Sequence, residues 1–266
     1  MVRAAMSVWE IGNGTWHMAD CFDAMRTIPD GSVDMILCDL PYGTTACSWD
    51  SILPFEPLWA EYWRIVKPNA PIILFGAEPF SSKLRLSALQ YFKYDWIWRK
   101  NTPGGFAQAK NMPLKQHEVV SVFTQGACTH LSQSNRRTPY FPQGLLGSGK
   151  IAKNSKRHRE ESAFGNRPSH RESYVQEFTN YPNSILDFNV SRGFHPTQKP
   201  VALFEYLIRT YTQPGETVLD NTAGSGTTAI AAEQSDRRWI CIERDPEYSM
   251  RALDRIQTHL EAKPCV

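Results

Sequence analysis

Four consecutive residues, Asp39-Leu40-Pro41-Tyr42, follow the apolar run VDMILC at residues 33–38. Asp39 offers a carboxylate, and Pro41 stiffens the turn because it fixes its own φ and disfavours helical backbone at Leu40. The backbone carbonyl of Pro41 is a second hydrogen-bond acceptor, and Tyr42 adds a flat ring. Two acceptors beside a stacking ring are what an exocyclic amino group on a planar base requires.

This tetrapeptide could therefore activate such an amine. The amine of adenine is a poor nucleophile because its lone pair is conjugated into the ring. Two hydrogen bonds from its N–H groups draw the nitrogen toward tetrahedral geometry and stabilise the positive charge that develops as it attacks. A methyl sulfonium held in line would supply the electrophile, and a base in a duplex would have to flip out to reach it. A plain turn at the end of a strand is the alternative.

A glycine-rich segment, NTAGSGTT at residues 221–228, joins an apolar run that ends at Asp220 to a helix-like stretch. A strand, a glycine turn and a helix N-terminus form a ligand-binding corner in open α/β sheets. A phosphate-binding P-loop would place a lysine after Gly226, and the sequence has threonine there. Residues 224–229 do satisfy the GxGxx(G/A) pattern of dinucleotide folds, with Glu243 at the end of the next apolar run.

S-adenosylmethionine (SAM) is the third candidate ligand for this corner. The glycines would let the backbone approach its methionine part, and Glu243 would grip its ribose diol. Asp220 favours SAM over a dinucleotide, because a carboxylate suits a ligand with an ammonium and a sulfonium and is poorly placed beside a pyrophosphate. A tight turn without any ligand is the alternative.

These motifs need a scaffold, and the apolar patterns predict one. Short apolar runs bounded by turn residues are typical of buried parallel strands, and stretches with helical spacing alternate with them. The predicted strands are 33–38, 70–76, 94–100, 118–123, 216–220 and 238–243, and the predicted helices are 54–68, 227–234 and 246–260. This alternation predicts an α/β fold with a doubly wound, largely parallel sheet.

Charge is spread unevenly over the 266 residues. Residues 136–171 hold nine basic and two acidic side chains, a net charge of +7, whereas the rest of the chain holds 20 basic and 25 acidic ones, a net charge of −5. A basic block on an acidic body indicates either a polyanionic partner such as DNA or a solvated loop.

The remaining composition sets broad limits. The six cysteines are scattered without a CxxC pair, so reduced thiols and no metal site are expected. No apolar run approaches the ~18 residues of a membrane span, and the N-terminal residues lack the apolar core of a signal peptide. A cytoplasmic protein without a membrane partner is therefore expected.

Taken together, DLPYG and AGSGTT resemble the motifs of the amino-group DNA methyltransferases, which use SAM to modify adenine N6 or cytosine N4. The tetrapeptide comes first and the SAM loop lies near the C-terminus, an order similar to the circularly permuted β class. HPTQKP (195–200), KQHEVVSVF (115–123) and MADCFDAM (18–25) resemble further elements of that class. The resemblance extends over residues 16–260.

The resemblance implies a role for each matching residue. Asp39, Pro41 and Tyr42 would be catalytic, and Asp39 would also border the cofactor. The residues that would bind SAM are Asp20 and Cys21 at its adenine, Glu243 at its ribose, Asp220, Ala223, Gly224, Gly226 and Thr227 around its methionine, and His195, Thr197 and Lys199 at its carboxylate. Lys199 as a surface charge, and His195 as a packed side chain, are the alternatives.

Two departures from the family pattern affect the expected site. Leu40 stands where the family most often has proline, and the sequence indicates no role for it. Asn221 and Thr222 stand where the family commonly has Pro-Phe, so an aromatic side chain beside the cofactor is missing. Asp39 favours adenine as the target, since cytosine-N4 enzymes more often carry serine there.

The β class recognises its target between the strand that carries the His-Glu pair, here KQHEVVSVF, and the HPTQKP segment. The resemblance therefore implies a catalytic domain at residues 1–125 and 191–266 and a target-recognition insertion at 126–190. The basic residues expected to contact DNA are Arg136, Arg137, Lys150, Lys153, Lys156, Arg157 and Arg159.

The sequence thus predicts a SAM-dependent, site-specific DNA methyltransferase that acts on adenine N6. The alternatives are a methyltransferase that acts on cytosine N4 and a DNA-binding module without catalysis. The glycine pattern alone also allows a NAD-dependent oxidoreductase. A homodimer and a separate restriction endonuclease are partners that the resemblance allows.

Overall fold

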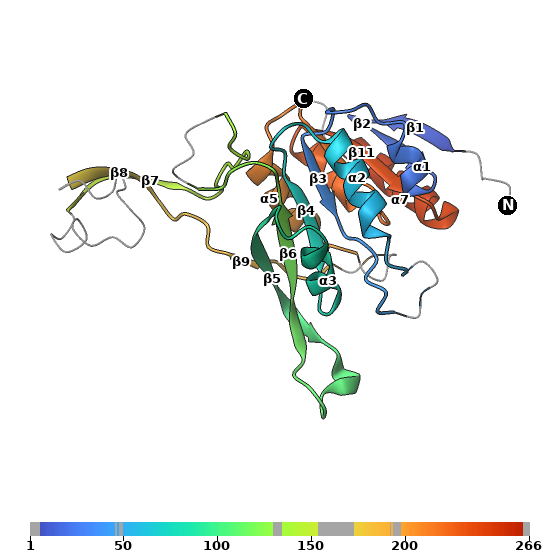
Figure 1. Ribbon diagram of the computed structural model, residues 1–266, viewed down its shortest axis with the longest axis horizontal. Coiled ribbons are helices and arrows are strands. Elements are labelled where there is room, and N and C mark those ends of the chain that lie inside the picture. The colour runs from blue at the N-terminus through green and yellow to red at the C-terminus, as the bar shows by residue number, and fades with distance from the viewer. Residues whose placement is uncertain are drawn as a thin grey trace. The chain divides into compact units, whose positions relative to one another are not determined.

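The computed structural model describes residues 6–45, 47, 50–129, 135–153, 173–191, 193 and 198–262. Contacts divide the chain into two compact units, one formed by residues 1–141 with 184–266 and the other by residues 142–183. Within the described residues, the larger unit holds a nine-stranded sheet with helices, and the smaller unit holds a two-stranded hairpin (Figure 1).

Strands and helices alternate along the larger unit. Its strands are β1 Ser7–Ile11, β2 Gly14–Met18, β3 Met35–Cys38, β4 Ile72–Gly76, β5 Phe92–Gly104, β6 Lys115–Phe123, β9 Ile185–Asp187, β10 Thr217–Asp220 and β11 Arg238–Glu243. Its helices are α1 Cys21–Met25, α2 Phe55–Ile65, α3 Phe80–Ser87, the short 3-10 helix η1 Phe106–Gln108, α5 Val201–Tyr211, α6 Thr227–Gln234 and α7 Pro246–Glu261.

The strand order of the sheet is β1-β2-β11-β10-β3-β4-β6-β5-β9. The central strands from β2 to β4 run parallel, while β1 and β6 pair with their neighbours in antiparallel fashion. Strand β3 pairs with β10, so that Val218 lies opposite Met35 and Leu219 opposite Ile36. The tetrapeptide after β3 and the glycine loop after β10 therefore leave the sheet at the same edge, where open α/β sheets bind ligands.

Both faces of the central strands are buried, which explains their unbroken apolar runs. Successive side chains of a strand point to opposite faces. Met35 and Leu37 of β3 pack with residues of α5, α6 and α7, whereas Ile36 and Cys38 pack with residues of α1, α2 and α3. The helices thus cover both faces of the sheet, and the predicted α/β class with a largely parallel sheet is confirmed.

The ends of the helices follow from local chemistry. Helix α2 stops at Ile65, before the predicted limit, because Pro68 disfavours helical backbone at the preceding residue and Val66 is already extended. Helix α7 begins at Pro246, and the side chain of Asp245 accepts hydrogen bonds from two backbone N–H groups of its first turn. Among the helices that the structure describes, none has the length and apolar character to cross a bilayer.

The structure adds elements that the sequence patterns did not indicate. Helices α3 and α5 and the β1–β2 hairpin are additions to the predicted set. Strands β5 and β6 are longer than predicted and form an antiparallel hairpin, with Arg99 opposite His117 and Gly104 opposite Lys115. The apolar pattern covers only the halves of β5 and β6 that pack in the core, so it could not indicate their exposed halves.

The smaller unit is an antiparallel hairpin of β7 Leu146–Lys153 and β8 Ser173–Thr179, with Ile151 opposite Val175. These two side chains are 70% and 59% exposed, so the described part of this unit has little core. The predicted target-recognition insertion, residues 126–190, extends beyond this unit at both ends. Its role in DNA recognition stays a prediction.

We predict that truncation of a core leucine in α5 is costly, whereas the same change on the surface is not. Leu207 is fully buried against the sheet, and Leu207→Ala should lower the free energy of unfolding by about 2–5 kcal/mol. Leu86→Ala is the matched control, because Leu86 is 72% exposed and its loss should cost less than about 0.5 kcal/mol. Urea denaturation measures both, and equal costs would contradict the observed packing.

Candidate active site

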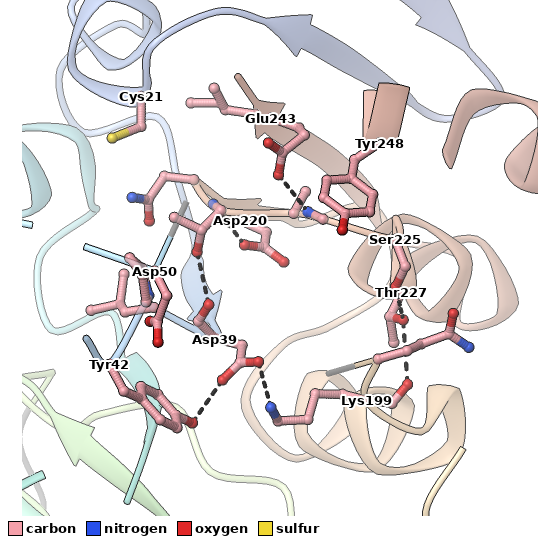
Figure 2. Close-up of a pocket in the computed structure, with 18 of the residues that line it drawn as sticks. Cys21, Asp39, Tyr42, Asp50, Lys199, Asp220, Ser225, Thr227, Glu243 and Tyr248 are labelled. Carbon is pink, nitrogen blue, oxygen red and sulfur yellow. Dashed lines mark hydrogen bonds and ion pairs between the residues drawn. The ribbon is translucent and has the colours of Figure 1, made fainter. Parts of the chain in front are cut away.

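A cavity of about 340 Å³ lies at the carboxyl ends of β3, β10 and β11 (Figure 2). The predicted catalytic and cofactor residues that line it are Asp20, Cys21, Asp39, Pro41, Tyr42, Lys199, Asp220, Ala223, Gly224, Thr227 and Glu243. Gly226 is absent from the described lining, and His195 and Thr197 fall outside the described residues. The tetrapeptide and the glycine loop, far apart in sequence, therefore share one cavity.

Asp39 is held by two side chains within the cavity. Its carboxylate forms an ion pair with the ammonium of Lys199 and accepts a hydrogen bond from the hydroxyl of Tyr42 at 2.7 Å (Figure 2). Burial raises the pKa of Asp39, and the charge of Lys199 opposes that rise. Burial alone would lower the pKa of Lys199, but the Asp39 and Glu118 carboxylates raise it above its usual value, so this lysine stays charged.

Glu118 is a second buried carboxylate at this point, and the sequence indicated no role for it. Its carboxylate pairs with Lys100 of β5 and lies 3.4 Å from the Lys199 ammonium and 3.3 Å from the Tyr42 hydroxyl. Burial alone would raise the pKa of Glu118, but the charges of Lys199 and Lys100 lower it to about 2. Two carboxylates and two ammonium groups thus balance one another beside the cavity.

The aromatic ring of the tetrapeptide is fixed on one side. Tyr42 stacks on Phe80 of α3, with ring centres 5.0 Å apart and planes 23° apart. Burial and the charge of Asp39 raise the pKa of the Tyr42 phenol well above its usual value, so it remains a neutral donor. Leu40 is buried among the residues of α1 and α2, so it anchors the turn, a role that the sequence did not indicate.

The loop after the tetrapeptide closes around Asp50, another residue that the sequence did not single out. The backbone N–H groups of Gly43, Thr44 and Thr45 donate to its carboxylate at 2.8, 2.9 and 2.7 Å. Burial tends to raise the pKa of Asp50, but these hydrogen bonds lower it below its usual value. Asp50 therefore keeps a negative charge that holds this part of the cavity wall in place.

The glycine loop depends on backbone conformations that other residues rarely adopt. Gly224 and Gly226 have φ angles of 49° and 73°. The N–H of Gly224 donates to the carboxylate of Glu243 at 2.9 Å, and burial raises the pKa of this glutamate. A Cβ atom on Gly226 would lie 3.1 Å from Ile256 of α7. Gly226 thus shapes the turn from behind the cavity wall.

Asp220 is buried at the end of β10. It accepts hydrogen bonds from the hydroxyl of Thr228 and, at 3.1 Å, from the N–H of Thr222. Burial raises its pKa to about 7, because the two hydrogen bonds offset only part of the cost of burying the charge. At neutral pH this carboxyl group is close to half protonated.

The two residues that depart from the family pattern both have structural partners. The hydroxyl of Thr222 donates to the backbone carbonyl of Asp39 at 3.1 Å, which ties the glycine loop to the tetrapeptide. The side-chain oxygen of Asn221 accepts from the hydroxyl of Tyr62 at 2.6 Å and from the thiol of Cys38 at 2.9 Å. Both residues thus make polar contacts with other parts of the fold.

The basic residues predicted to contact DNA fall in both units. Arg136 and Arg137 are exposed in the larger unit, and Lys150 and Lys153 are exposed on β7 of the smaller one. Lys156, Arg157 and Arg159 lie outside the described residues. Their contact with DNA stays a prediction.

Comparisons with known proteins match nearly the whole chain. A family model described as DNA methylase covers residues 33–254, which include the tetrapeptide and the glycine loop. The type II methyltransferase M1.MboII of Moraxella bovis is 26% identical over 251 residues, which are 89% of this chain and 94% of that enzyme.

Solved structures share the fold. The M1.HpyAVI–SAM complex matches with a TM-score of 0.58 and 23% identity over 90% of this chain and 98% of that one. PvuII DNA methyltransferase, described as cytosine-N4-specific, matches with a TM-score of 0.60 and 16% identity over 94% of this chain and 92% of that one.

We predict that Asp220 titrates near neutral pH in the ligand-free protein. Carboxyl-carbon NMR should show an aspartate with a pKa of about 7 that is missing from the spectrum of Asp220→Asn. This pKa lies above the unfolded value of about 3.9. Between about pH 4 and 7, the aspartate therefore keeps its proton in the folded chain but has lost it in the unfolded chain. The free energy of unfolding should therefore fall as pH rises through that window, and fall less in Asp220→Asn. Identical pH dependence in the two proteins would contradict this prediction.

Proposed function

Because the chain belongs to the N6/N4 DNA methylase family, we propose that it transfers a methyl group from SAM to N6 of adenine in DNA. The predicted family and SAM as its cofactor are confirmed, so the chain is a SAM-dependent amino-methyltransferase of DNA. The choice of adenine and the roles of individual residues belong to the proposal.

One observation carries the proposal. The residues expected to hold the target amine and those expected to hold the cofactor line the same cavity. In Figure 2, Tyr42, Asp39 and Lys199 lie along the lower part of the cavity, and Glu243 and Tyr248 lie along the upper part. A methyl donor and an acceptor base bound there would be neighbours, which is the main requirement of direct transfer.

The chemistry of the cavity wall fits SAM. This cofactor supplies an electrophilic methyl group on a positively charged sulfur. Glu243 offers carboxylate oxygens to a ribose diol, and Asp20 and Asp220 suit a cationic ligand. The hydroxyls of Ser225 and Thr227 line the same wall, 3.1 Å apart, and can turn to donate or accept.

The tetrapeptide would hold the adenine amine. One oxygen of Asp39 accepts from Tyr42 and the other pairs with Lys199, so the carboxylate is fixed before any base arrives. Each oxygen has a further lone pair for an N–H of the base, and the carbonyl of Pro41 would take the second N–H. These bonds strengthen as the nitrogen gains positive charge, which lowers the barrier to attack.

In the transfer, the methyl–sulfur bond would break and leave its electron pair on a neutral sulfur, so the methylated nitrogen would carry the positive charge and have to lose one proton. Asp39 already accepts that N–H in the proposed complex and is the adjacent acceptor. Its pKa is raised by burial, which makes it a better acceptor than an exposed aspartate. Lys199 is charged and takes no proton, and its role is to hold the carboxylate.

Cytosine N4 is the second candidate target. The observation in its favour is the similarity in fold to PvuII DNA methyltransferase, which is described as cytosine-N4-specific. Asp39 favours adenine by resemblance, as cytosine-N4 enzymes more often carry serine at that position. Incubation with labelled SAM and genomic DNA, followed by nucleoside analysis, should give N6-methyladenine. Label found only in N4-methylcytosine would show that the target is cytosine and not adenine. DNA without any label would overturn the proposed function.

Residues 126–190 would select the DNA sequence, and the basic block within them would bind phosphates. A homodimer and a separate restriction endonuclease stay predictions that rest on the resemblance, and a cytoplasmic location stays a prediction that rests on the apolar pattern of the sequence.

We predict that Asp39→Ala abolishes methyl transfer but keeps both ligands. Loss of the carboxylate removes an acceptor of the target amine, so the rate should fall at least about a hundredfold. Asp39→Asn is the matched variant, because its amide oxygen still accepts an N–H, and it should keep more activity than Asp39→Ala. Methylation is measured with labelled SAM, and calorimetry with SAM and with DNA checks that binding persists. Wild-type activity in Asp39→Ala would remove Asp39 from the mechanism.

We also predict that the basic block binds phosphates. Substitution of Lys153, Lys156, Arg157 and Arg159 by alanine should weaken DNA binding and reduce its dependence on salt, by up to about 0.9 in the log–log slope for each lost phosphate contact. Fluorescence anisotropy of labelled duplex DNA over a salt series measures this slope. A slope equal to that of the wild type would show that the block makes no phosphate contacts.

A further inference from the structure

We propose that the β5–β6 arm, residues 99–117, is a second DNA-binding element that contacts the duplex beside the flipped base. This inference rests on the proposed function and concerns a segment outside the basic block and outside the predicted recognition insertion. The partner is the same DNA whose base enters the cavity.

The arm projects beyond the sheet. Its strands pair at Arg99 with His117 and at Gly104 with Lys115, and η1 forms the turn between them (Figure 1). Residues 101–117 are exposed except for Pro103 and Leu114, which are partly buried. A ribbon with so little contact to the body has no evident role in holding the core together.

The charge of the arm is of one sign. The sequence has no acidic residue between Asp95 and Glu118, and the arm carries four basic ones. Arg99 pairs with Asp187 and Lys100 with Glu118, both at the base of the arm. The other two, Lys110 and Lys115, are exposed on the projecting part, where they suit the phosphates of DNA.

The tip of the arm adds exposed apolar side chains. Phe106 is 64% exposed and Met112 is 59% exposed, close to Lys110. Large apolar side chains beside lysines can rest on base edges or fill the gap that opens in the stack when a base is flipped out. The amides of Gln108 and Asn111 lie at the same tip and can bond to base edges.

The position of the arm connects it to the cavity. Trp98, Lys100 and Glu118 at its base line the cavity wall. From Lys100 to Gly104, β5 extends about 13 Å at ~3.3 Å per residue, and η1 lies beyond that. A duplex whose base enters the cavity would therefore lie within reach of the arm, and a two-stranded ribbon is narrow enough to enter a major groove.

A second copy of this chain is the other conceivable partner for an exposed arm. The charge of the arm argues against contact between two arms, because their positively charged lysines would repel one another. The body of the chain carries an excess of acidic residues, so the basic arm of one copy could bind weakly to the body of another. The experiment must separate this self-association from DNA binding.

The experiment compares arm variants with matched controls on α3. Lys110→Ala together with Lys115→Ala should lower the slope of log affinity against log salt by up to about 1.8, or ~0.9 for each phosphate contact, whereas exposed Lys83→Ala should leave it unchanged. Phe106→Ala should weaken DNA binding roughly tenfold, whereas Leu86→Ala should not. The probe is a labelled mixed-sequence duplex, and SAM affinity by calorimetry should stay unchanged in every variant.

Each outcome decides the proposal. Loss of DNA affinity with intact SAM binding supports the arm as a DNA-binding element. Wild-type DNA affinity and a wild-type salt slope in the arm variants would overturn the proposal. If those variants also alter the oligomeric state in analytical ultracentrifugation, the arm is a self-association surface instead. The labelled-SAM assay of the wild type distinguishes this failure from that of the proposed function, because only the latter leaves genomic DNA unmethylated.

Discussion

The ion pair between Asp39 and Lys199 is the contact on which the rest of the site depends. Both side chains are largely buried, and a buried charge without a partner is costly. Asp39 follows β3 and Lys199 precedes α5, so the pair joins two distant parts of the chain at one edge of the sheet. Glu118 and Lys100 extend it into a cluster of balanced charge, which keeps the carboxylate fixed without neutralising it.

This cluster can form because the sheet places β10 beside β3. Their pairing brings the glycine loop next to the tetrapeptide, and the hydroxyl of Thr222 closes the contact on the carbonyl of Asp39. Two polar substitutions in the loop, which looked like losses when judged from sequence, therefore have partners in the fold. The cavity is shaped by backbone turns on one side and by fixed charges on the other.

Local patterns were sufficient to predict β3, β4, β10, β11, α6 and α7, because the apolar spacing of these elements depends on neighbouring residues alone. They could not indicate Glu118 or Lys100 as part of the site, since both become relevant only through pairing between strands and across the cavity. Lys199 was expected at the carboxylate of the cofactor, which stays a prediction, and its ammonium forms an ion pair with Asp39 that the local sequence could not indicate. The sequence did not indicate the exposed arm, because the arm has no buried face and its residues therefore show no apolar periodicity.

The strand order also constrains how the chain can be assembled. Among the described strands of the sheet, β10 and β11 are synthesised last, yet they occupy its middle, between the β1–β2 hairpin and β3. A nascent chain that lacks them would present two unpaired edges, on β2 and on β3, until the final segment inserts. Strand pairings over such sequence distances form slowly, so the two parts of the sheet can join only after β10 and β11 have been synthesised.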